Sequence, residues 1–562
     1  MPLLRRCSRL ALLARLALAA LPAPATACAQ PAPARTAEPP LKLAPRPTTA
    51  AITDADLMTR LYIFADDSML GREAGTEGSV RGTAYIARQL ALIGARPAGD
   101  SGTYFQTVPF LRRIVSPRSA VSVDGTPLAL WTDVVPTGGS RSLDGAEVVF
   151  GGVQGEPLAI TAAQAAGKVV LLGGLASGYA LPAVGPGSPL HDAAGVALVV
   201  SDETLARTAG AQRRPRVVPP RKPGPAPLVV QVSARAARLM LGRSPDGAVV
   251  GTAGRRLTGT LFYEMEPAPA RNVVAVIPGT DPALRGSYVA LGAHSDHVGV
   301  ASAAVDHDSL KAFNREVWRL RGAYAGLPEL SPEQRAAIRV NVDSLRRLRP
   351  ARRDSVYNGA DDDGSGSMAL LEIAEALAKG PKRPKRSVLF VWHTGEEKGL
   401  LGSLYFTDNP TVPRDSIVAQ INIDMIGRGQ AQDTQGGGPG YVGVVGARRL
   451  STELGALLDS VNRGRREALS FDYRLDADGH PENIYCRSDH YEYARFGIPV
   501  AFFFTGLHGD YHQVTDEPQY IDYANYGRIT RFIYDLTLRV ADLGHRPAVD
   551  GPRMEPGMPC RQ

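Results

Sequence analysis

Five mainly apolar runs from residue 272 onward have the composition of buried strands. Each run is short, contains valine, isoleucine or phenylalanine, and is bounded by glycine, proline or a polar residue. Segments with helical periodicity lie between the runs. This alternation predicts an α/β domain with a mixed, mostly parallel sheet flanked by helices. The expected strands are residues 272–279, 287–294, 387–394, 418–427 and 498–506.

The pattern changes between about residues 131 and 263. Short β-rich runs such as VVLLGG and VALVVSD alternate there with loops rich in glycine and proline. We expect a small β-rich domain, residues 131–263, inserted into an α/β domain made of residues 51–130 and 264–543, with a tail at 544–562. Membership of these strands in the main sheet stays open, because short apolar runs are not specific.

Residues 300–357 interrupt the α/β pattern with two amphipathic helical segments. The second segment begins with Ser331, Pro332 and Gln334, which form a good helix start signal. We expect a helical hairpin that forms a lid or rim beside the site, and an interaction surface is the alternative.

The N-terminus has the pattern of an export signal. Residues 1–29 carry basic residues, then an apolar run, then small residues, and residues 30–50 are a Pro- and Ala-rich linker. The apolar run contains Arg15 and is too short for a stable membrane span. We expect an exported protein, periplasmic or extracellular, and a lipid anchor at Cys28 is the less favoured alternative.

Composition excludes some classes of protein. The chain of 562 residues has a net charge of +7, but its arginines are scattered and do not form the aromatic-lined basic face that nucleic-acid binding requires. Its four cysteines leave Cys486 and Cys560 in the mature chain, enough for one disulfide and too few for a cysteine-based zinc site. Oligomeric state stays open.

Polar residues follow several of the expected strands. In α/β sheets the carboxyl ends of parallel strands meet at one edge, so residues distant in sequence can converge there. Imidazole and carboxylate groups suit zinc, and one carboxylate can bridge two ions about 3.5–4 Å apart. The adjacent pair Glu396 and Glu397 is informative, because one glutamate can bind metal while the other takes a proton from water.

The ordered motifs resemble those of the co-catalytic dizinc aminopeptidases, metallopeptidase family twenty-eight, which includes leucyl aminopeptidases and, more remotely, glutamate carboxypeptidase. The motifs are HSD, GADDDGSG, GEEKGLLGS, NIDMIG, RSDHYEYARFGIP and YHQVTD, in this order from residue 294 to 516. The β-rich segment resembles a protease-associated domain. The resemblance implies a zinc exopeptidase fold and removal of N-terminal residues from peptides.

The resemblance also implies two zinc ions per chain and five ligands. In the family one His and one Asp hold the first ion, a Glu and a His hold the second, and an Asp three residues before the Ser of an SG pair, here Ser365, bridges both. In that order, the implied ligands are His294 and Asp424, Glu397 and His512, and Asp362.

Roles without metal contact follow from the same resemblance. Glu396 would be the general base, and Asp296 would orient His294 through its other ring nitrogen. His512 fits the Tyr-His motif with Asp four residues later, so His508 is expected at the cleft edge or the surface. Three further histidines are expected to be structural: His297, His307 and His490.

Other functions remain open. A glutamate-carboxypeptidase-like enzyme or a dipeptidase could use the same site, and Arg428 and Arg487 lie in motif-bearing loops. A glutaminyl cyclase would use a single zinc and does not depend on His294. A dizinc amidohydrolase would place its extra domain between the last two ligand motifs, whereas here it precedes the first. A metal-free binding protein would lack the ligands that this chain retains.

Overall fold

The computed structural model describes residues 40–174, 183–219, 226–322, 329–553 and 560–562. The predicted signal segment, residues 1–29, lies outside the described residues, and so does the first part of the predicted linker. In the part of the chain that is described, no helix is both long and apolar enough to cross a membrane.

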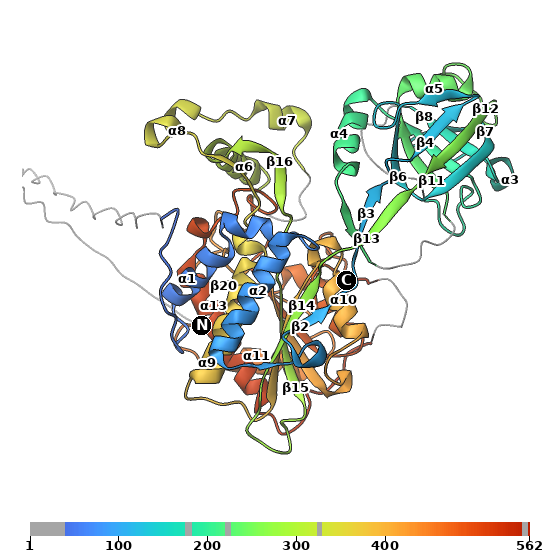
Figure 1. The fold of residues 1–562 in the computed structure, drawn as a ribbon. Coiled ribbons are helices and arrows are strands. Elements are labelled where there is room, and N and C mark those ends of the chain that lie inside the picture. The colour runs from blue at the N-terminus through green and yellow to red at the C-terminus, as the bar shows by residue number, and fades with distance from the viewer. Residues whose placement is uncertain (1–39, 175–182, 220–225, 323–328, 554–559) are drawn as a thin grey trace, which may run out of the picture. The chain divides into compact units, whose positions relative to one another are not determined.

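A nine-stranded mixed sheet forms the centre of the main domain (Figure 1). Its four central strands run parallel, and the strands outside them pair mostly antiparallel. All five predicted strands are present, and the predicted sheet flanked by helices is confirmed. The order across the sheet is β1 (Arg96–Pro97), β14 (Arg271–Ile277), β18 (Ser387–His393), β15 (Tyr288–His294), β19 (Ile417–Ile423), β22 (Val500–Phe504), β20 (Tyr441–Val445) and β21 (Ser470–Asp472), with β2 (Phe105–Thr107) paired to β14.

Helices cover both faces of this sheet. Successive strand residues enter different cores, as Val273 and Val274 of β14 do, because side chains alternate between the two faces of a strand. The larger core lies under α1 (Asp54–Phe64), α2 (Glu77–Ile93), α9 (Gly366–Lys379), α11 (Thr452–Arg463) and α13 (Tyr523–Ala541). The smaller core lies under α10 (Leu401–Asp408) and α12 (His490–Ala494).

A second sheet, separate from the first, forms the inserted domain, which we define as residues 120–261. It has its own apolar core, so these strands are not part of the main sheet. Its strand order is β5 (Thr126–Leu128), β4 (Ala120–Val123), β12 (Ala253–Leu261), β7 (Arg141–Val153), β8 (Val169–Gly173), β9 (Gly195–Val199), β11 (Leu228–Val232) and β6 (Val134–Gly138). Its helices are α3 (Ala162–Ala165), α4 (Asp202–Gln212) and α5 (Ala234–Leu241).

The inserted domain begins before the predicted boundary at residue 131. Strand β4 pairs with β12, and Val121, Val123 and Leu128 lie in its core. These strands are too short for their alternation to mark them in the sequence. A three-stranded sheet of β10 (Arg216–Val218), β3 (Leu111–Val115) and β13 (Tyr263–Pro267) contains the two chain segments that lead into and out of the domain.

The helical insertion at 300–357 is framed by a strand pair. Strands β16 (Val300–Asp306) and β17 (Arg353–Val356) pair antiparallel and enclose α6 (His307–Leu320), α7 (Pro332–Ala337) and α8 (Val342–Leu348). The predicted capping box at Ser331 and Gln334 is confirmed. The prediction that one helix follows Ser331 is wrong, because two short helices are present. The first ends at Ile338, a β-branched residue of low helix propensity. The second begins after Asn341, whose side chain caps it.

Candidate metal centre

The carboxyl ends of the four central parallel strands meet at one edge of the main sheet. Strand β15 ends at His294, β19 is followed by Asp424, and β18 is followed by the short turn η4 (Glu396–Lys398). Strand β22 leads into the loop 505–517, which carries His512. The seven residues that the sequence predicted for the site therefore lie together, as the convergence of strand ends requires.

One group of potential metal ligands contains His294, Asp362 and Asp424, all buried. The His294 Nε2 atom lies 3.1 Å from Asp362 Oδ1 and 3.6 Å from Asp424 Oδ1. Burial lowers the pKa of His294, but the carboxylates of Asp424 and Glu396 outweigh burial and hold it well above its ordinary value. Without a cation, the imidazole thus carries the positive charge that offsets these carboxylates.

A second group contains Asp362, Glu397 and His512 together with His297. The His512 Nε2 atom lies 3.0 Å from both Asp362 Oδ2 and Glu397 Oε2. Burial opposes ionisation of Asp362, but the nearby imidazoles of His294 and His512 outweigh burial and hold the pKa of Asp362 well below its ordinary value. Asp362 belongs to both groups, with one oxygen toward each.

His297 was expected to be structural, but it lies within the second group. Its Nδ1 atom lies 2.8 Å from Glu397 Oε1 and 3.6 Å from Asp362 Oδ2. It is three residues after His294, in the same loop at the end of β15. The repeat of histidine in the HSDH stretch was the available signal, but spacing alone does not show that the loop turns both rings toward the carboxylates.

The two groups fit metal ions, judged by their unpaired polar atoms. Among the described residues, the Nε2 atoms of His294 and His512 and the Oδ2 atom of Asp362 are buried without a hydrogen-bond partner, which is costly unless a ligand supplies the contact. Imidazole and carboxylate donors with shared access to one carboxylate suit zinc.

A third group, His307, Asp354 and Glu517, gives a useful contrast. His307 contacts Asp354 Oδ2 at 3.0 Å and the Tyr520 hydroxyl at 3.2 Å. Arg352 donates two hydrogen bonds of 2.9 Å to Glu517. These atoms already have partners and a guanidinium beside them, so the group is an ion-pair network rather than a metal site.

Glu396 lies at the edge of the first group. Its Oε2 atom is 3.9 Å from His294 Nε2. Burial raises the pKa of Glu396 well above its ordinary value, and the charges of Asp424 and Glu397 add to this, whereas His294 opposes it. Asp296 accepts a hydrogen bond of 3.2 Å from the backbone N–H of Glu396 through Oδ1. The backbone carbonyl of Asp296 lies 3.1 Å from His294 Nδ1, closer than its carboxylate at 3.8 Å.

The two aspartates beside Asp362 hold the surrounding strands. Asp363 Oδ2 accepts from the backbone N–H of His294 at 3.0 Å, and its Oδ1 accepts from Met425 N–H at 3.2 Å. Asp361 Oδ1 accepts from Gly427 N–H at 2.6 Å. The three adjacent carboxylates therefore have separate contacts, and the peptide bond between Asp362 and Asp363 is cis.

His508 is not at the surface, so that expectation is wrong. It is 3% exposed, and its Nε2 atom lies 3.2 Å from Asp361 Oδ2. Asp516, in the same loop, accepts hydrogen bonds from the backbone N–H groups of Asp361 and Asp362 at 2.9 and 3.1 Å. The loop that carries His512 thus also holds the loop that carries Asp362.

Arg72 and Ser488 support the site and were not identified from the sequence. The buried Arg72 guanidinium donates to the backbone carbonyls of Asn358 at 2.7 Å and Ser295 at 3.3 Å, which joins the loops of His294 and Asp362. The Ser488 hydroxyl donates to Asp424 Oδ2 at 2.7 Å. The carbonyl groups that Arg72 contacts are far from it in the sequence, so only the tertiary fold brings them together.

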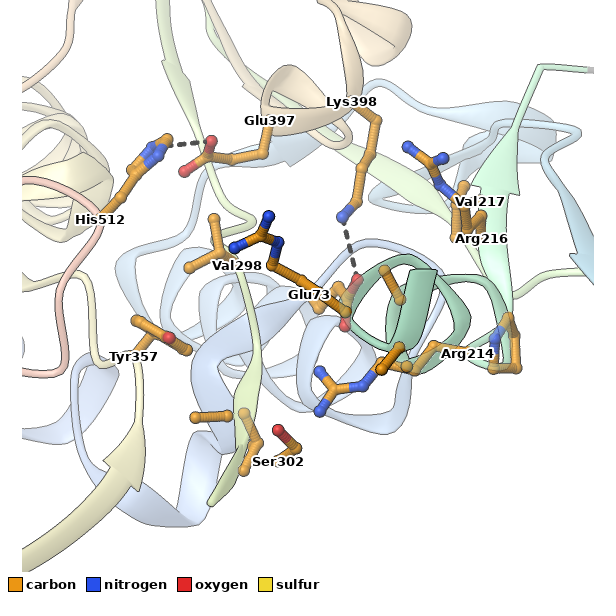
Figure 2. A pocket seen from close by; sticks show the side chains of 17 residues that line it. Glu73, Arg214, Arg216, Val217, Val298, Ser302, Tyr357, Glu397, Lys398 and His512 are labelled. Atoms are coloured by element: carbon orange, nitrogen blue, oxygen red, sulfur yellow. Dashed lines mark hydrogen bonds and ion pairs between the residues drawn. The ribbon is translucent and has the colours of Figure 1, made fainter. Parts of the chain in front are cut away.

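Two cavities reach the metal groups. The larger, of about 1070 Å³, is lined by Glu397 and His512 at one end (Figure 2). The smaller is bordered by Asp362, Glu396 and Asp424, and most of its other lining residues are apolar or aromatic. These are Met425, Ile484, Phe502, Phe504, Leu507 and Tyr511.

Comparison with protein families gives one match. Residues 338–537 match the model of peptidase family M28. This segment contains Asp362, Glu396, Glu397, Asp424 and His512, but begins after His294 and Asp296.

Individual proteins match over shorter stretches. Leupeptin-inactivating enzyme 1 of Streptomyces exfoliatus is 30% identical over 169 residues, 30% of this chain and 33% of that protein. A probable leucine aminopeptidase of Arthroderma otae is 28% identical over 205 residues, 36% of this chain and 51% of that protein. The matches thus span a third to a half of these relatives. The solved structure of an aminopeptidase from Aneurinibacillus sp. strain AM-1 aligns with 90% of this chain and with 98% of the aminopeptidase chain. The sequence identity is 14% and the TM-score is 0.48, so this alignment adds nothing to the family match.

Proposed function

We propose that this chain, a member of peptidase family M28 through residues 338–537, is a zinc-dependent aminopeptidase that removes N-terminal residues from peptides. The observation that carries the proposal is the sharing of Asp362 between two groups of metal ligands, with the carboxyl group of Glu396 beside them. The names of the curated relatives support the substrate class.

We assign two zinc ions to the two groups. His294, Asp424 and Asp362 would hold the first, and Glu397, His512 and Asp362 would hold the second. Bound zinc supplies Lewis-acid chemistry, acidifying water and polarising the scissile carbonyl. Asp363 accepts a hydrogen bond from the backbone N–H of His294, and Asp516 accepts one from the backbone N–H of Asp362, so the backbone of two of these ligands is held in place.

Glu396 has the properties required of the proton carrier. Its side chain is 13% exposed, toward the smaller cavity, and the N–H bond to Asp296 fixes its backbone. As general base, its Oε2 atom would take a proton from the attacking water and later return it to the leaving amine.

The two arginines in the motif-bearing loops differ in what they say about a carboxypeptidase. Arg428 is buried and contacts Asp510 at 3.1 Å and Asp516 at 3.5 Å, so it supports no pocket for a terminal carboxylate. Arg487 pairs with Glu482 at 2.7 Å but also lines the smaller cavity beside the candidate ligands, so the carboxypeptidase alternative rests on Arg487. A glutamate-carboxypeptidase-like enzyme, a dipeptidase or a glutaminyl cyclase is the alternative.

The first test is hydrolysis of leucine 4-nitroanilide and leucyl peptides. Activity should disappear with a zinc chelator and return with Zn²⁺, and metal analysis should give two ions per chain. N-terminally acetylated peptides should not be cleaved. Cleavage from the carboxyl end, or cyclisation of N-terminal glutamine as the main activity, would contradict the proposal.

Replacing Glu396 tests the base. Glu396→Gln should lower kcat by roughly 10²–10⁴-fold, because proton transfer is lost, while zinc content stays unchanged. Glu397→Gln is the matched comparison, because it should lower zinc content as well. Near-normal turnover in Glu396→Gln would show that another group moves the proton.

We also propose that the protein is exported, with residues 1–29 removed, and that the inserted domain is a protease-associated-like domain. The Cys486–Cys560 disulfide supports an oxidising compartment. N-terminal sequencing of the mature protein tests this: a start near Gln30 is expected, a lipid-modified Cys28 would show an anchor, and Met1 would contradict export.

A further inference from the structure

The larger cavity carries an excess of positive charge from the inserted domain. Arg207, Arg214 and Arg216 line it together with Lys398, and the carboxylates in its lining belong to Glu73 and Glu397. Figure 2 shows Arg214 and Arg216 on the side of the cavity away from His512.

The carboxylates of the lining are already engaged. Lys398 Nζ pairs with Glu73 at 2.9 Å, and Glu397 faces His297 and His512. No carboxylate of the described residues lies within ion-pair distance of the three arginines, which are exposed; the one hydrogen bond of their side chains joins Arg207 to the Thr204 hydroxyl at 3.3 Å. Their guanidinium groups are therefore available to a ligand.

The backbone next to Arg214 and Arg216 is held against the main domain. Val217 lies in β10, which pairs with β3, and it packs against a small apolar cluster that includes Ala74 and Ala268. The approach is close, since a Cβ on Gly75, whose φ is +78°, would lie 2.6 Å from the Val217 side chain. Pro215 restricts the backbone between Arg214 and Arg216. The backbone at Arg214 and Arg216 is thus fixed, while the side chains of both arginines are exposed.

We propose that this wall, Arg207, Arg214 and Arg216, binds a carboxylate on the leaving-group side of the peptide substrate. The inference rests on the proposed function, in which the substrate amine lies at the acidic metal centre and the rest of the peptide extends into the cavity. Guanidinium groups bind carboxylates with paired hydrogen bonds, and a cleft lined by one sign of charge concentrates ligands of the opposite sign. The carboxylate is a free C-terminus of a short peptide or an acidic side chain.

Four peptides test the proposal: Leu-Gly-Gly and its amide, and the amides of Leu-Gly-Glu and Leu-Gly-Gln. The enzyme with zinc should favour the carboxylate member of at least one pair by roughly 2–5-fold in kcat/KM, through KM, as expected for exposed charge pairs. The preference should shrink at about 0.5 M salt. The pair that shows it identifies the source of the carboxylate.

The double variant Arg214→Gln/Arg216→Gln should bring that ratio close to one. Arg213→Gln is the matched control, because Arg213 is the next exposed residue but lies over the Trp131 ring, 5.3 Å from its centroid, and does not line the cavity; it should keep the wild-type ratio. A wild-type ratio near one in both pairs, or a double variant that keeps the preference, would overturn the carboxylate site while leaving the peptidase intact. If zinc restores no hydrolysis of any of the four peptides, the proposed function fails and this site fails with it.

Discussion

Asp362 differs from the two aspartates beside it in what its oxygens contact. Its Oδ1 faces His294 and its Oδ2 faces His512, whereas Asp361 and Asp363 accept hydrogen bonds from backbone N–H groups. Three like charges in a row are tolerated because each has a different set of partners.

Asp362→Asn should therefore remove metal from both groups. We expect zinc content to fall by about one ion per chain or more and activity to fall by at least about 100-fold, because one shared ligand serves both ions. Metal analysis after dialysis is the measurement. Asp354→Asn, in the third group with His307, is the control and should retain zinc; equal losses in both variants would argue against the assignment.

Burial of His490 leads us to expect that the folded protein loses stability at acid pH. It is fully buried beside Phe502, and burial lowers its pKa from 6.5 to about 3. The folded state therefore binds fewer protons than the unfolded state between these values, so the stabilising contribution of neutral His490 is present above pH 6.5 and is lost as the pH falls.

In metal-free protein, His490→Leu should reduce the loss of unfolding free energy between about pH 7 and pH 5 by about 2 kcal/mol. Urea unfolding at both pH values is the measurement. His545→Leu, at an exposed position, is the surface control. An unchanged pH dependence in His490→Leu would mean that His490 is already protonated in the folded protein.

The candidate site was predictable wherever a ligand directly follows a strong apolar run. His294, Asp424 and Glu397 are of this kind. His297 and Ser488 were not predictable, because their contacts with Glu397 and Asp424 depend on the course of loops. His508 was misplaced for the same reason: an isolated histidine in a glycine-containing loop gives no sign that it contacts Asp361.

At the scale of elements, α6 packs against the loop that carries His512. Lys311 of α6 pairs with Asp510 and lies 3.9 Å from the centre of the Tyr520 ring. The Trp318 indole donates to the Asp433 carbonyl at 2.6 Å. The helical insertion thus contacts the loop that carries His512, and its strand β16 lines the larger cavity.

Lys311→Met should weaken the binding of one zinc ion by roughly 10–100-fold, because Asp510, two residues before His512, loses one of its two cationic partners and keeps only Arg428. Competition with a chromophoric chelator measures the affinity, and Lys311→Arg should restore it. Arg319→Met is the control, since Arg319 lies on the exposed side of α6 and pairs with Glu316. Identical zinc affinities for Lys311→Met and wild type would rule out this support.

Elements were predictable in proportion to their length and burial. The five long apolar strands emerged from composition alone, and the capping box at Ser331 marked a helix start correctly. The short strands β4 and β5 were not predictable, because pairing across the sheet determines them. The helix break at Ile338 was not predictable either, because it depends on a balance of weak helix propensities.

At the scale of the whole molecule, the end of the chain is fixed beside the site. Cys560 forms a disulfide with Cys486, and the Gln562 side chain accepts from the backbone N–H of Tyr485 at 2.9 Å. These contacts hold the short turn η7 (Ile484–Cys486), which leads to Ser488 and its hydrogen bond to Asp424. The sequence left open whether Cys486 and Cys560 pair, and the structure contains this disulfide.

Cys560→Ser should lower the free energy of unfolding by about 2–4 kcal/mol, because the disulfide closes a loop with a sequence separation of 74. Unfolding curves with and without reductant provide the measurement. Reductant should destabilise the wild type by a similar amount and leave the variant unchanged. A variant as stable as the oxidised wild type would show that the remaining tail contacts suffice.

The pairing of β16 with β17 has a consequence for how such a chain can be altered. Val300 lies opposite Val356, and Asp306 lies opposite Arg353, so the two ends of the helical insertion leave the main domain side by side. A cassette with adjoining ends can be excised and replaced by a tight turn, or grafted onto a related scaffold, without stretching the host sheet. The main sheet lies outside the strand pair, and the helices that contact the loop of His512 lie between β16 and β17. Exchange of this one contiguous segment should therefore change zinc affinity without changing the main sheet.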